Sequence, residues 1–317
     1  MKAAVVTEPG HAPQYQDFPE PIASAGEAIA TMQAAGLHPV VKSLASGQHY
    51  ASGGQLPAIP GLDGVGVLGD GRTVFCVTTR SPYGTMAEKT VVNPEKCISI
   101  PERLDPTQAA AIVNPGISAW LSLKLRANLA AGETVLILGA TGVAGQLAVQ
   151  AARFLGAGKI IAAGRNVETL KTLPIDAVIP LSESEESISE AFSAQLKDGG
   201  IDVVIDYLWG RNTELLLAAI AKGFRREATA RTRLVEVGAI AGPTISLPAA
   251  VLRSVDLTLM GSGLGSVPLN QIMNAIPTFF SLAAEGHLSV AVESVPLAQV
   301  EQAWTAVQKG KRIVFSI

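Results

Sequence analysis

Two different patterns of hydrophobic and polar positions divide the chain. Up to about residue 101, short apolar runs are interrupted by glycine and proline, as in AAGLHP, IPGLDGVGVL and RSPYGTMAE. Such runs between turn residues are typical of short strands, and they predict a mostly β unit. From Asp105 onward, apolar strands alternate with helix-forming stretches. This alternation predicts an α/β unit in which helices cover both faces of a parallel sheet.

Six apolar runs are the expected strands of the parallel sheet. They lie at 134–138, 159–163, 176–179, 202–206, 234–238 and 257–260. One of the helices between them has a recognisable start, because Ser182 and Glu185 form an S-x-x-E capping box. Ile188 and Phe192 follow on one face of this predicted helix. The acidic stretch around them is therefore interpreted as the solvated start of a helix.

A glycine-rich loop follows the first of these strands, in the sequence VLILGATGVAGQLAVQ. In a dinucleotide-binding fold, the first glycine makes a tight turn, the second lets the backbone approach a pyrophosphate, and the third lets helix and strand pack closely. The phosphate then binds amide groups at the positive end of the helix. We predict a phosphate site here, the alternative being an ordinary glycine-rich turn. Its residues are Gly139, Thr141, Gly142, Val143, Ala144 and Gly145.

The end of the second strand indicates which dinucleotide binds. Proteins that bind NAD place an Asp or Glu there, which accepts hydrogen bonds from the adenosine ribose. This chain instead has Gly164, Arg165 and Asn166, with Arg165 at 20 residues beyond Gly145. A guanidinium pairs well with a 2′-phosphate, and glycine leaves space for it. We therefore predict NADPH as the cofactor; the alternative is an arginine on a solvated surface.

Composition excludes several classes of function. The chain has 317 residues, 48% of them hydrophobic, and a formal net charge of −3, which gives no basic surface for nucleic acid. Its two cysteines, Cys76 and Cys97, are too few for a disulfide framework or a four-thiolate zinc site. The sequence has no uninterrupted run of 18 apolar residues, so no membrane span is predicted. A cytoplasmic protein of two domains is expected.

The order of these segments resembles the medium-chain dehydrogenase/reductase family, in particular its zinc-independent quinone oxidoreductases. Similar segments extend through nearly all of the chain, including AAGLHP, IPGLDGVGVL, YGTMAEKTVV, QAAAIVNPGISAWLSL, DVVIDYLWG and VPLAQVEQAW. The resemblance implies a Rossmann domain, a doubly wound parallel sheet, inserted into a GroES-like mostly β catalytic domain. The implied domains are 107–257 for NADPH and 1–106 plus 258–317 for catalysis. A homodimer is also implied.

Zinc-dependent members of the family carry Cys and His-Glu ligands in two segments that can be matched here. These segments read Gly36-Leu37-His38-Pro39 and Gly61-Leu62-Asp63-Gly64. His38 and Asp63 are two possible ligands, whereas a catalytic zinc site has three protein ligands. No metal is therefore expected. The resemblance then implies direct hydride transfer from NADPH to a small-molecule quinone or α,β-unsaturated carbonyl, which needs alignment and a hydrogen bond to the acceptor oxygen.

The resemblance also suggests residues beside the substrate and the nicotinamide. Tyr50 lies where related reductases carry a tyrosine near the substrate; the alternatives are His49 beside it, or a tyrosine that only forms part of the loop. His38 lies where relatives have an asparagine close to the nicotinamide, and a packed histidine is the alternative. Asn114 and Ser118 resemble the segment beside the nicotinamide, with helix capping by Asn114 as the competing interpretation.

Further cofactor contacts are expected where later strands end, because open α/β sheets bind ligands at the carboxyl ends of their strands. These positions are Trp209, Val237, Gly238, Ala239, Ile240, Gly261, Ser262 and Gly263. The basic stretch at 222–233 is interpreted as a solvated loop or as an additional contact to the adenosine phosphate. Lys311 and Arg312 near the C-terminus are further candidates for cofactor contact.

Two other functions stay open at this level. A short-chain-type carbonyl reductase also carries GATGxxG, but its loop opens the chain and its chemistry needs Tyr-x-x-x-Lys. Here 138 residues precede the loop, and no tyrosine has a lysine four positions on. The second is a structural or regulatory protein that binds NADPH with little turnover.

Overall fold

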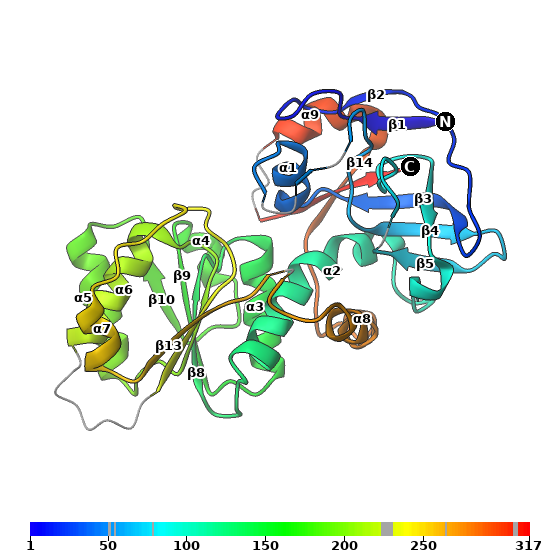
Figure 1. The fold of residues 1–317 in the computed structure, drawn as a ribbon. Coiled ribbons are helices and arrows are strands. Elements are labelled where there is room, and N and C mark those ends of the chain that lie inside the picture. Colours follow the sequence, from blue (N-terminus) through cyan, green and yellow to red (C-terminus); the bar gives the residue numbers. More distant parts are fainter. Residues whose placement is uncertain (50–51, 54, 78, 223–230, 264, 307–309) are drawn as a thin grey trace. The chain divides into compact units, whose positions relative to one another are not determined.

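The computed structural model describes residues 1–49, 52–53, 55–77, 79–222, 231–263, 265–306 and 310–317 (Figure 1). The chain forms two compact units. The first unit comprises Met1–Pro115 and Asn274–Ile317, and the second comprises Gly116–Met273. The segment that forms the second unit is therefore inserted into the sequence of the first. Both boundaries fall inside helices, α2 (Pro106–Leu121) and α8 (Leu269–Ala284).

In the described part of the second unit, six parallel strands form a sheet in the order β10-β9-β8-β11-β12-β13. The chain leaves β8 toward one edge and returns at β11 to build the other edge, which is a doubly wound topology. The switch point between β8 and β11 is where such sheets bind ligands. The strands are β8 (Thr134–Leu138), β9 (Lys159–Gly164), β10 (Ala177–Pro180), β11 (Val203–Asp206), β12 (Thr232–Glu236) and β13 (Leu257–Gly261).

Helices lie on both faces of this sheet, as Figure 1 shows. One apolar cluster joins the strands, through Leu136, Ile161 and Val204, to Phe192 of α5 and Leu216 of α6. All five of these side chains are fully buried. The connecting elements are η2 (Ser122–Arg126), α3 (Val143–Phe154), α4 (Val167–Lys171), α5 (Glu185–Lys197), α6 (Gly210–Lys222) and α7 (Ala249–Ser254).

Two local predictions need correction. Helix α5 begins at Glu185 with Ser184 as its N-cap, and the Ser184 hydroxyl accepts a hydrogen bond from the Ser187 amide (3.3 Å). The predicted capping box at Ser182 is therefore wrong. The predicted apolar face of this helix is confirmed, because Ile188 and Phe192 are buried. Strand β12 begins at Thr232, two residues before the predicted start, because the register with β11 already pairs Arg233 with Val203.

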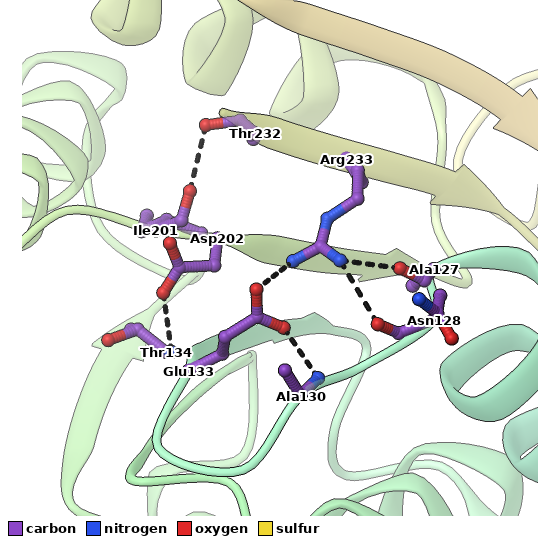
Figure 2. A network of polar contacts seen from close by, with 9 residues as sticks. All are labelled: Ala127, Asn128, Ala130, Glu133, Thr134, Ile201, Asp202, Thr232 and Arg233. Carbon is purple, nitrogen blue, oxygen red and sulfur yellow. Dashed lines mark hydrogen bonds and ion pairs between the residues drawn. The ribbon is translucent and has the colours of Figure 1, made fainter. Parts of the chain in front are cut away.

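Arg233 anchors a polar network at the amino ends of the strands (Figure 2). Its guanidinium donates to the carbonyls of Ala127 (2.6 Å) and Asn128 (3.2 Å) and pairs with the Glu133 carboxylate. The other oxygen of Glu133 accepts from the Ala130 amide (2.8 Å). Of the basic stretch, 223–230 lie outside the described residues, and Arg233 lies at the end of the sheet opposite the glycine loop. A contact between Arg233 and the adenosine phosphate is thereby excluded.

Two more hydrogen bonds, also shown in Figure 2, connect the amino ends of these strands. Asp202 accepts from the Thr134 amide (2.8 Å), which joins the start of β11 to the start of β8. The Thr232 hydroxyl donates to the Ile201 carbonyl (2.8 Å) and ties β12 to the same place. Polar groups at the amino ends of the strands are thus bonded to each other. The site residues predicted for this sheet lie at the opposite end, where the strands have their carboxyl ends.

The described part of the first unit is mostly β. Seven strands form a mixed sheet on the path β14-β15-β3-β4-β5-β7, with β6 paired to β3, and β1 pairs with β2 in a separate ladder. The C-terminal strand β15 pairs with β3, so the end of the chain completes this sheet. The strands are β1 (Lys2–Val5), β2 (Gln14–Asp17), β3 (Ala28–Gly36), β4 (Gly64–Leu68), β5 (Thr73–Cys76), β6 (Lys89–Val92), β7 (Ile98–Ser99), β14 (Val292–Pro296) and β15 (Arg312–Ser316).

Short helices complete this unit, namely α1 (Pro39–Ala45), η1 (Pro94–Lys96), η3 (Leu297–Gln299) and α9 (Val300–Thr305). The predicted domain division at 257/258 lies within β13, whose pairing with β12 continues to Gly261. In the described part of the chain, no helix is both long and apolar enough to cross a membrane.

Candidate functional site

The glycine loop joins β8 to α3 through a close contact between backbone segments. Gly139 adopts a positive φ of 88°, and the amides of Gly139 and Ala140 both donate to the Ala163 carbonyl (2.9 and 3.0 Å). A Cβ added at Gly145 would lie 2.3 Å from the Gly139 carbonyl oxygen, which is rigid backbone. Glycine is therefore required at 139 for its conformation and at 145 for packing of the helix on the strand.

Gly142 differs from its two neighbours in the motif. It is the N-cap of α3 in an extended conformation (φ −76°, ψ 162°), and an added Cβ would lie an ordinary 3.5 Å from the Gly139 oxygen. The fold itself therefore tolerates a side chain here. The next amides, of Val143, Ala144 and Gly145, have no carbonyl acceptor within the helix, because its first hydrogen bond runs from the Gln146 amide to the Gly142 carbonyl. This combination of open space and outward-directed amides fits a phosphate.

The end of β9 meets the same loop. A Cβ added at Gly164 would lie 2.8 Å from the Thr141 methyl carbon, so Gly164 lets the loop pack against the strand. Arg165 follows and is exposed. Asn166 caps α4, since its side-chain oxygen accepts from the Thr169 amide (3.1 Å). The structure thus brings Thr141 and Gly164 together beside an exposed guanidinium, where the sequence predicts the adenosine phosphate.

A buried carboxylate orders the segment after β11. Asp206 accepts from the amides of Leu208 (2.8 Å) and Trp209 (2.9 Å), and from the Thr213 hydroxyl (2.5 Å). Burial raises the pKa of Asp206, although these hydrogen bonds oppose the shift. Trp209 has a positive φ of 55°, which is unusual for a residue with a large side chain. The bonds to Asp206 hold Trp209 in this conformation at the end of β11.

A hollow of about 490 Å³ opens at the ends of β12 and β13. Its lining includes three predicted cofactor residues, Trp209, Ala239 and Gly261, together with Glu236. Burial, and then the neighbouring carboxylate of Asp206, raise the pKa of Glu236. The hollow is therefore a partly apolar site, and the pKa of the carboxyl in its lining lies above the usual range of a glutamate.

Other predicted residues around this hollow are engaged with the chain itself. The amides of Val237 and Gly238 both donate to the Asp206 carbonyl (2.8 and 3.2 Å). The Ser262 amide donates to the Glu236 carbonyl (2.8 Å), and the Gly263 amide donates to the Ser266 hydroxyl (2.7 Å). Ile240 is 82% exposed. Contacts from these positions to a ligand would therefore involve their carbonyls and side chains.

Sequence reasoning did not select Asp206 and Glu236. Each is the last residue of its strand, and the register places them side by side on β11 and β12. An acidic residue at the end of two consecutive apolar strands, as in VVID and LVE, was the available signal. The strand predicted at 234–238 has Glu236 in its interior, so the pattern alone does not place the two acids at the same end of the sheet.

The predicted nicotinamide segment is helical. Asn114 lies well inside α2, so helix capping by Asn114 is excluded. Ser118 is four residues further and thus on the same face of the helix. The buried hydroxyl of Tyr207 faces Ser118, and burial raises the pKa of Tyr207 despite that contact. Tyr207 is therefore a neutral hydrogen-bonding group rather than an acid or base.

A second group of predicted residues lies in the first unit, around a buried imidazole. His38 is the N-cap of α1 and fully buried, and its Nε2 lies 2.9 Å from Oδ1 of Asp63. Burial lowers the pKa of His38, and the charge of Arg312 adds to this effect while Asp63 opposes it. The imidazole is therefore neutral, with its Nε2–H assigned to the carboxylate. Nδ1 is then a buried acceptor, with no hydrogen-bond partner among the described residues.

Arg312 is part of this buried cluster and does not reach outward. It is 4% exposed, and its guanidinium donates to the Leu37 carbonyl (3.0 Å). Burial lowers the pKa of Arg312 to about 10, with Asp63 opposing the shift. The hypothesis that Arg312 binds the cofactor is therefore wrong. Its charge instead compensates that of Asp63 in the interior.

The remaining catalytic candidates follow α1. His49 is half-buried, whereas Tyr50 lies outside the described residues. Within the described ranges, no three His, Cys, Asp or Glu side chains gather into a group that could hold a metal ion. The candidates thus fall into two sets, a catalytic set in the first unit and a cofactor set that lies in the second unit, except for Asn114 and Lys311.

Comparison with known proteins assigns this arrangement to a family. No family model matches the sequence. A probable NADPH-dependent quinone reductase of Emericella nidulans is 26% identical over 99% of both chains. The quinone oxidoreductase of Sus scrofa is 32% identical over 66% of both chains. The chain belongs to the medium-chain dehydrogenase/reductase family, quinone oxidoreductase type.

Solved structures show that the fold is shared over the whole chain. A mycobacterial quinone oxidoreductase superimposes with a TM-score of 0.83 at 22% identity, and an NAD-dependent alcohol dehydrogenase with a TM-score of 0.85 at 22% identity. Each comparison covers 100% of both chains. The predicted fold, a Rossmann sheet inserted into a GroES-like unit, is confirmed. Like its relatives, this quinone oxidoreductase-type chain is an oxidoreductase.

The two glycines of α3 should respond differently to the same substitution. Gly145→Ala places a methyl against backbone and should lower the free energy of unfolding by at least about 1–3 kcal/mol. Gly142→Ala should change it by less than about 1 kcal/mol, because its φ suits alanine, yet weaken dinucleotide binding. Urea unfolding and cofactor titration check both effects. Equal destabilisation by the two changes would contradict the packing argument, and unchanged binding by Gly142→Ala would remove the phosphate site.

His38 should make stability depend on pH. Because burial lowers its folded pKa, the unfolded chain takes up a proton near pH 6.5 that the folded chain does not. The free energy of unfolding should therefore fall as pH decreases below about 6.5, by at most about 1.4 kcal/mol per pH unit from this residue. His38→Asn retains a donor to Asp63 and should remove this component. Urea unfolding of both proteins between pH 5 and 8 measures it, and parallel curves would contradict a neutral, buried His38.

Proposed function

We propose that this oxidoreductase transfers a hydride from NADPH to a quinone or an α,β-unsaturated carbonyl without a metal ion. The observation that carries the proposal is the match to a probable NADPH-dependent quinone reductase over 99% of both chains. Several curated quinone oxidoreductases that are 30–32% identical over about two thirds of the chain support the same acceptor class.

The second unit holds features that fit NADPH. The first-turn amides of α3 are directed toward the space above Gly142, and exposed Arg165 follows the strand end that packs against Thr141. A related mycobacterial structure with a TM-score of 0.82 was solved in complex with NADPH. When bound, NADPH supplies a hydride from C4 of its nicotinamide. We assign the pyrophosphate to the α3 amides and the 2′-phosphate to Arg165.

The residues of the first unit would serve the acceptor. We propose that Tyr50 or His49 donates a hydrogen bond to the acceptor oxygen as negative charge develops there. His38 is a poor proton donor at neutral pH, because its one N–H is engaged with Asp63. Its Nδ1 instead suits a hydroxyl or amide donor from a ligand. The protein thus aligns the reactants and stabilises the developing charge.

The kind and number of possible ligand side chains support a reaction without zinc. The two segments that carry ligands in zinc-dependent relatives supply only His38 and Asp63, and these two side chains are hydrogen-bonded to each other. A zinc ion would need a third ligand and would displace this bond. We further propose a cytoplasmic homodimer, following the family expectation.

Steady-state oxidation of NADPH tests the proposed function. A panel of quinones and enones should show turnover well above the uncatalysed rate, and a chelator should leave it unchanged. Elemental analysis should find less than stoichiometric zinc. NADPH binding without turnover on any acceptor would favour the binding protein considered from the sequence. One zinc ion per chain, with loss of activity on its removal, would contradict the metal-free reaction.

Arg165 should set the choice between the two nicotinamide cofactors. A charge-assisted hydrogen bond to the 2′-phosphate is worth about 1.5–3 kcal/mol, so Arg165→Ala should weaken NADPH binding by about 10- to 150-fold. NADH lacks this phosphate, and its affinity should change little. The matched control is Lys171→Ala, which removes an exposed charge of α4 that pairs with Glu168 (2.9 Å). Titration of both cofactors measures the effect, and equal losses for NADH and NADPH would remove Arg165 from cofactor selection.

A further inference from the structure

The two cysteines of the chain lie at neighbouring strand ends: Cys76 is the last residue of β5, and Cys97 directly precedes β7. Strands β5 and β7 are antiparallel, with Val74 facing Ser99 and Phe75 facing Ile98. The same register continued by one residue places Cys76 opposite Cys97. Cys97 has an extended backbone (φ −75°, ψ 142°), so the strand geometry persists to this position. The 20 residues between the cysteines in sequence therefore do not separate them in space.

Both thiols belong to one apolar cluster of the first unit. Cys76 is fully buried together with Val74 and Val92, and Cys97 packs against the same cluster while remaining partly exposed. On its other side, Cys76 is paired with Gly64 of β4. Cys76 is therefore enclosed by the cluster, whereas Cys97 keeps access to solvent.

The two sulfurs also differ in acidity. The neighbouring Cys76 thiol lowers the pKa of Cys97, and the positive charge of Arg72 contributes in the same direction, while burial opposes the shift. The Cys97 thiol donates a hydrogen bond to the Asn93 carbonyl (3.4 Å). The neighbouring Cys97 and then burial raise the pKa of Cys76. Because the thiolate is the reactive form, the partly exposed Cys97 is the sulfur that reacts first. Cys76 is protected from solvent but lies next to Cys97.

The spacing of paired strands suits a disulfide. Directly opposed residues in an antiparallel ladder have Cα atoms ~4.5–5.5 Å apart, and disulfides form at Cα separations of ~4.4–6.8 Å. Both cysteines can therefore be joined without moving the strands apart. The bond would close the segment 77–96, which contains β6.

We propose that Cys76 and Cys97 form a redox-active dithiol that a hydroperoxide oxidises to a reversible disulfide within one chain. The Cys97 thiolate attacks the outer peroxide oxygen, the O–O bond breaks, and an alcohol or water leaves, giving a sulfenic acid on Cys97. The Cys76 sulfur then attacks the Cys97 sulfur, and hydroxide leaves as water with the Cys76 proton. The two sulfurs lose two electrons, and the peroxide gains them.

Hydrogen peroxide applied to the folded, full-length protein tests the proposal. Intact mass under non-reducing conditions should fall by two hydrogen atoms per chain, and both thiols should resist alkylation after denaturation. A proteolytic map should contain one peptide pair linked through Cys76 and Cys97. Dithiothreitol should restore the original mass and both free thiols.

Two variants separate the roles of the sulfurs. Cys76→Ser should stop at a sulfenic acid on Cys97 that dimedone traps, whereas Cys97→Ser should leave Cys76 reduced under the same treatment. Three results with the unmodified protein would overturn the proposal, whatever the folding of the variants: two thiols that persist at millimolar peroxide, a sulfinic acid on Cys97 beside an untouched Cys76, or a disulfide that joins two chains on a non-reducing gel.

Discussion

The close approach of α3 to the end of β8 is the constraint on which the second unit depends. Gly145 meets the Gly139 carbonyl at a distance that excludes any side chain. The contact brings the amino end of the helix directly over the carboxyl end of the strand, so the first-turn amides are directed into the space above the sheet. The proposed phosphate site depends on this packing, and packing does not require glycine at position 142, which leaves Gly142 available for the ligand.

The amino ends and the carboxyl ends of the parallel strands differ in their polar groups, because all strands run in the same direction. At the amino ends, Arg233, Glu133 and Asp202 bond to neighbouring groups and leave a self-contained network. The carboxyl ends carry the first-turn amides of α3 and a hollow that is lined by Trp209 and Glu236. Parallel strands place all carboxyl ends together, so an acid at the end of one strand lies beside an acid at the end of the next. Burial, and then this proximity to Asp206, raise the pKa of Glu236.

Burial governs the first unit in the same way. Removing the charges of Asp63 and Arg312 from water is costly, and their proximity to each other and to the donor His38 offsets part of this cost. Burial lowers the pKa of His38, and the positive charge of Arg312 adds to this effect, so the imidazole remains neutral. The segments that bind zinc in related enzymes thus form a hydrogen-bonded pair here. Elsewhere in the unit, strand pairing places the only two thiols of the chain together.

The sequence by itself determined the α/β character of the second unit, the six strands within about two residues, and the family. These features depend on local periodicity and on short sequence motifs, whose residues are close together in the chain. Only the tertiary structure decided that Ser184 rather than Ser182 caps α5, that Arg312 is interior, and that Arg233 lies opposite the glycine loop. It alone paired Asp206 with Glu236, His38 with Asp63, and Cys76 with Cys97. The physical reason is that burial and strand register, which set charge and proximity, depend on contacts between residues far apart in the chain.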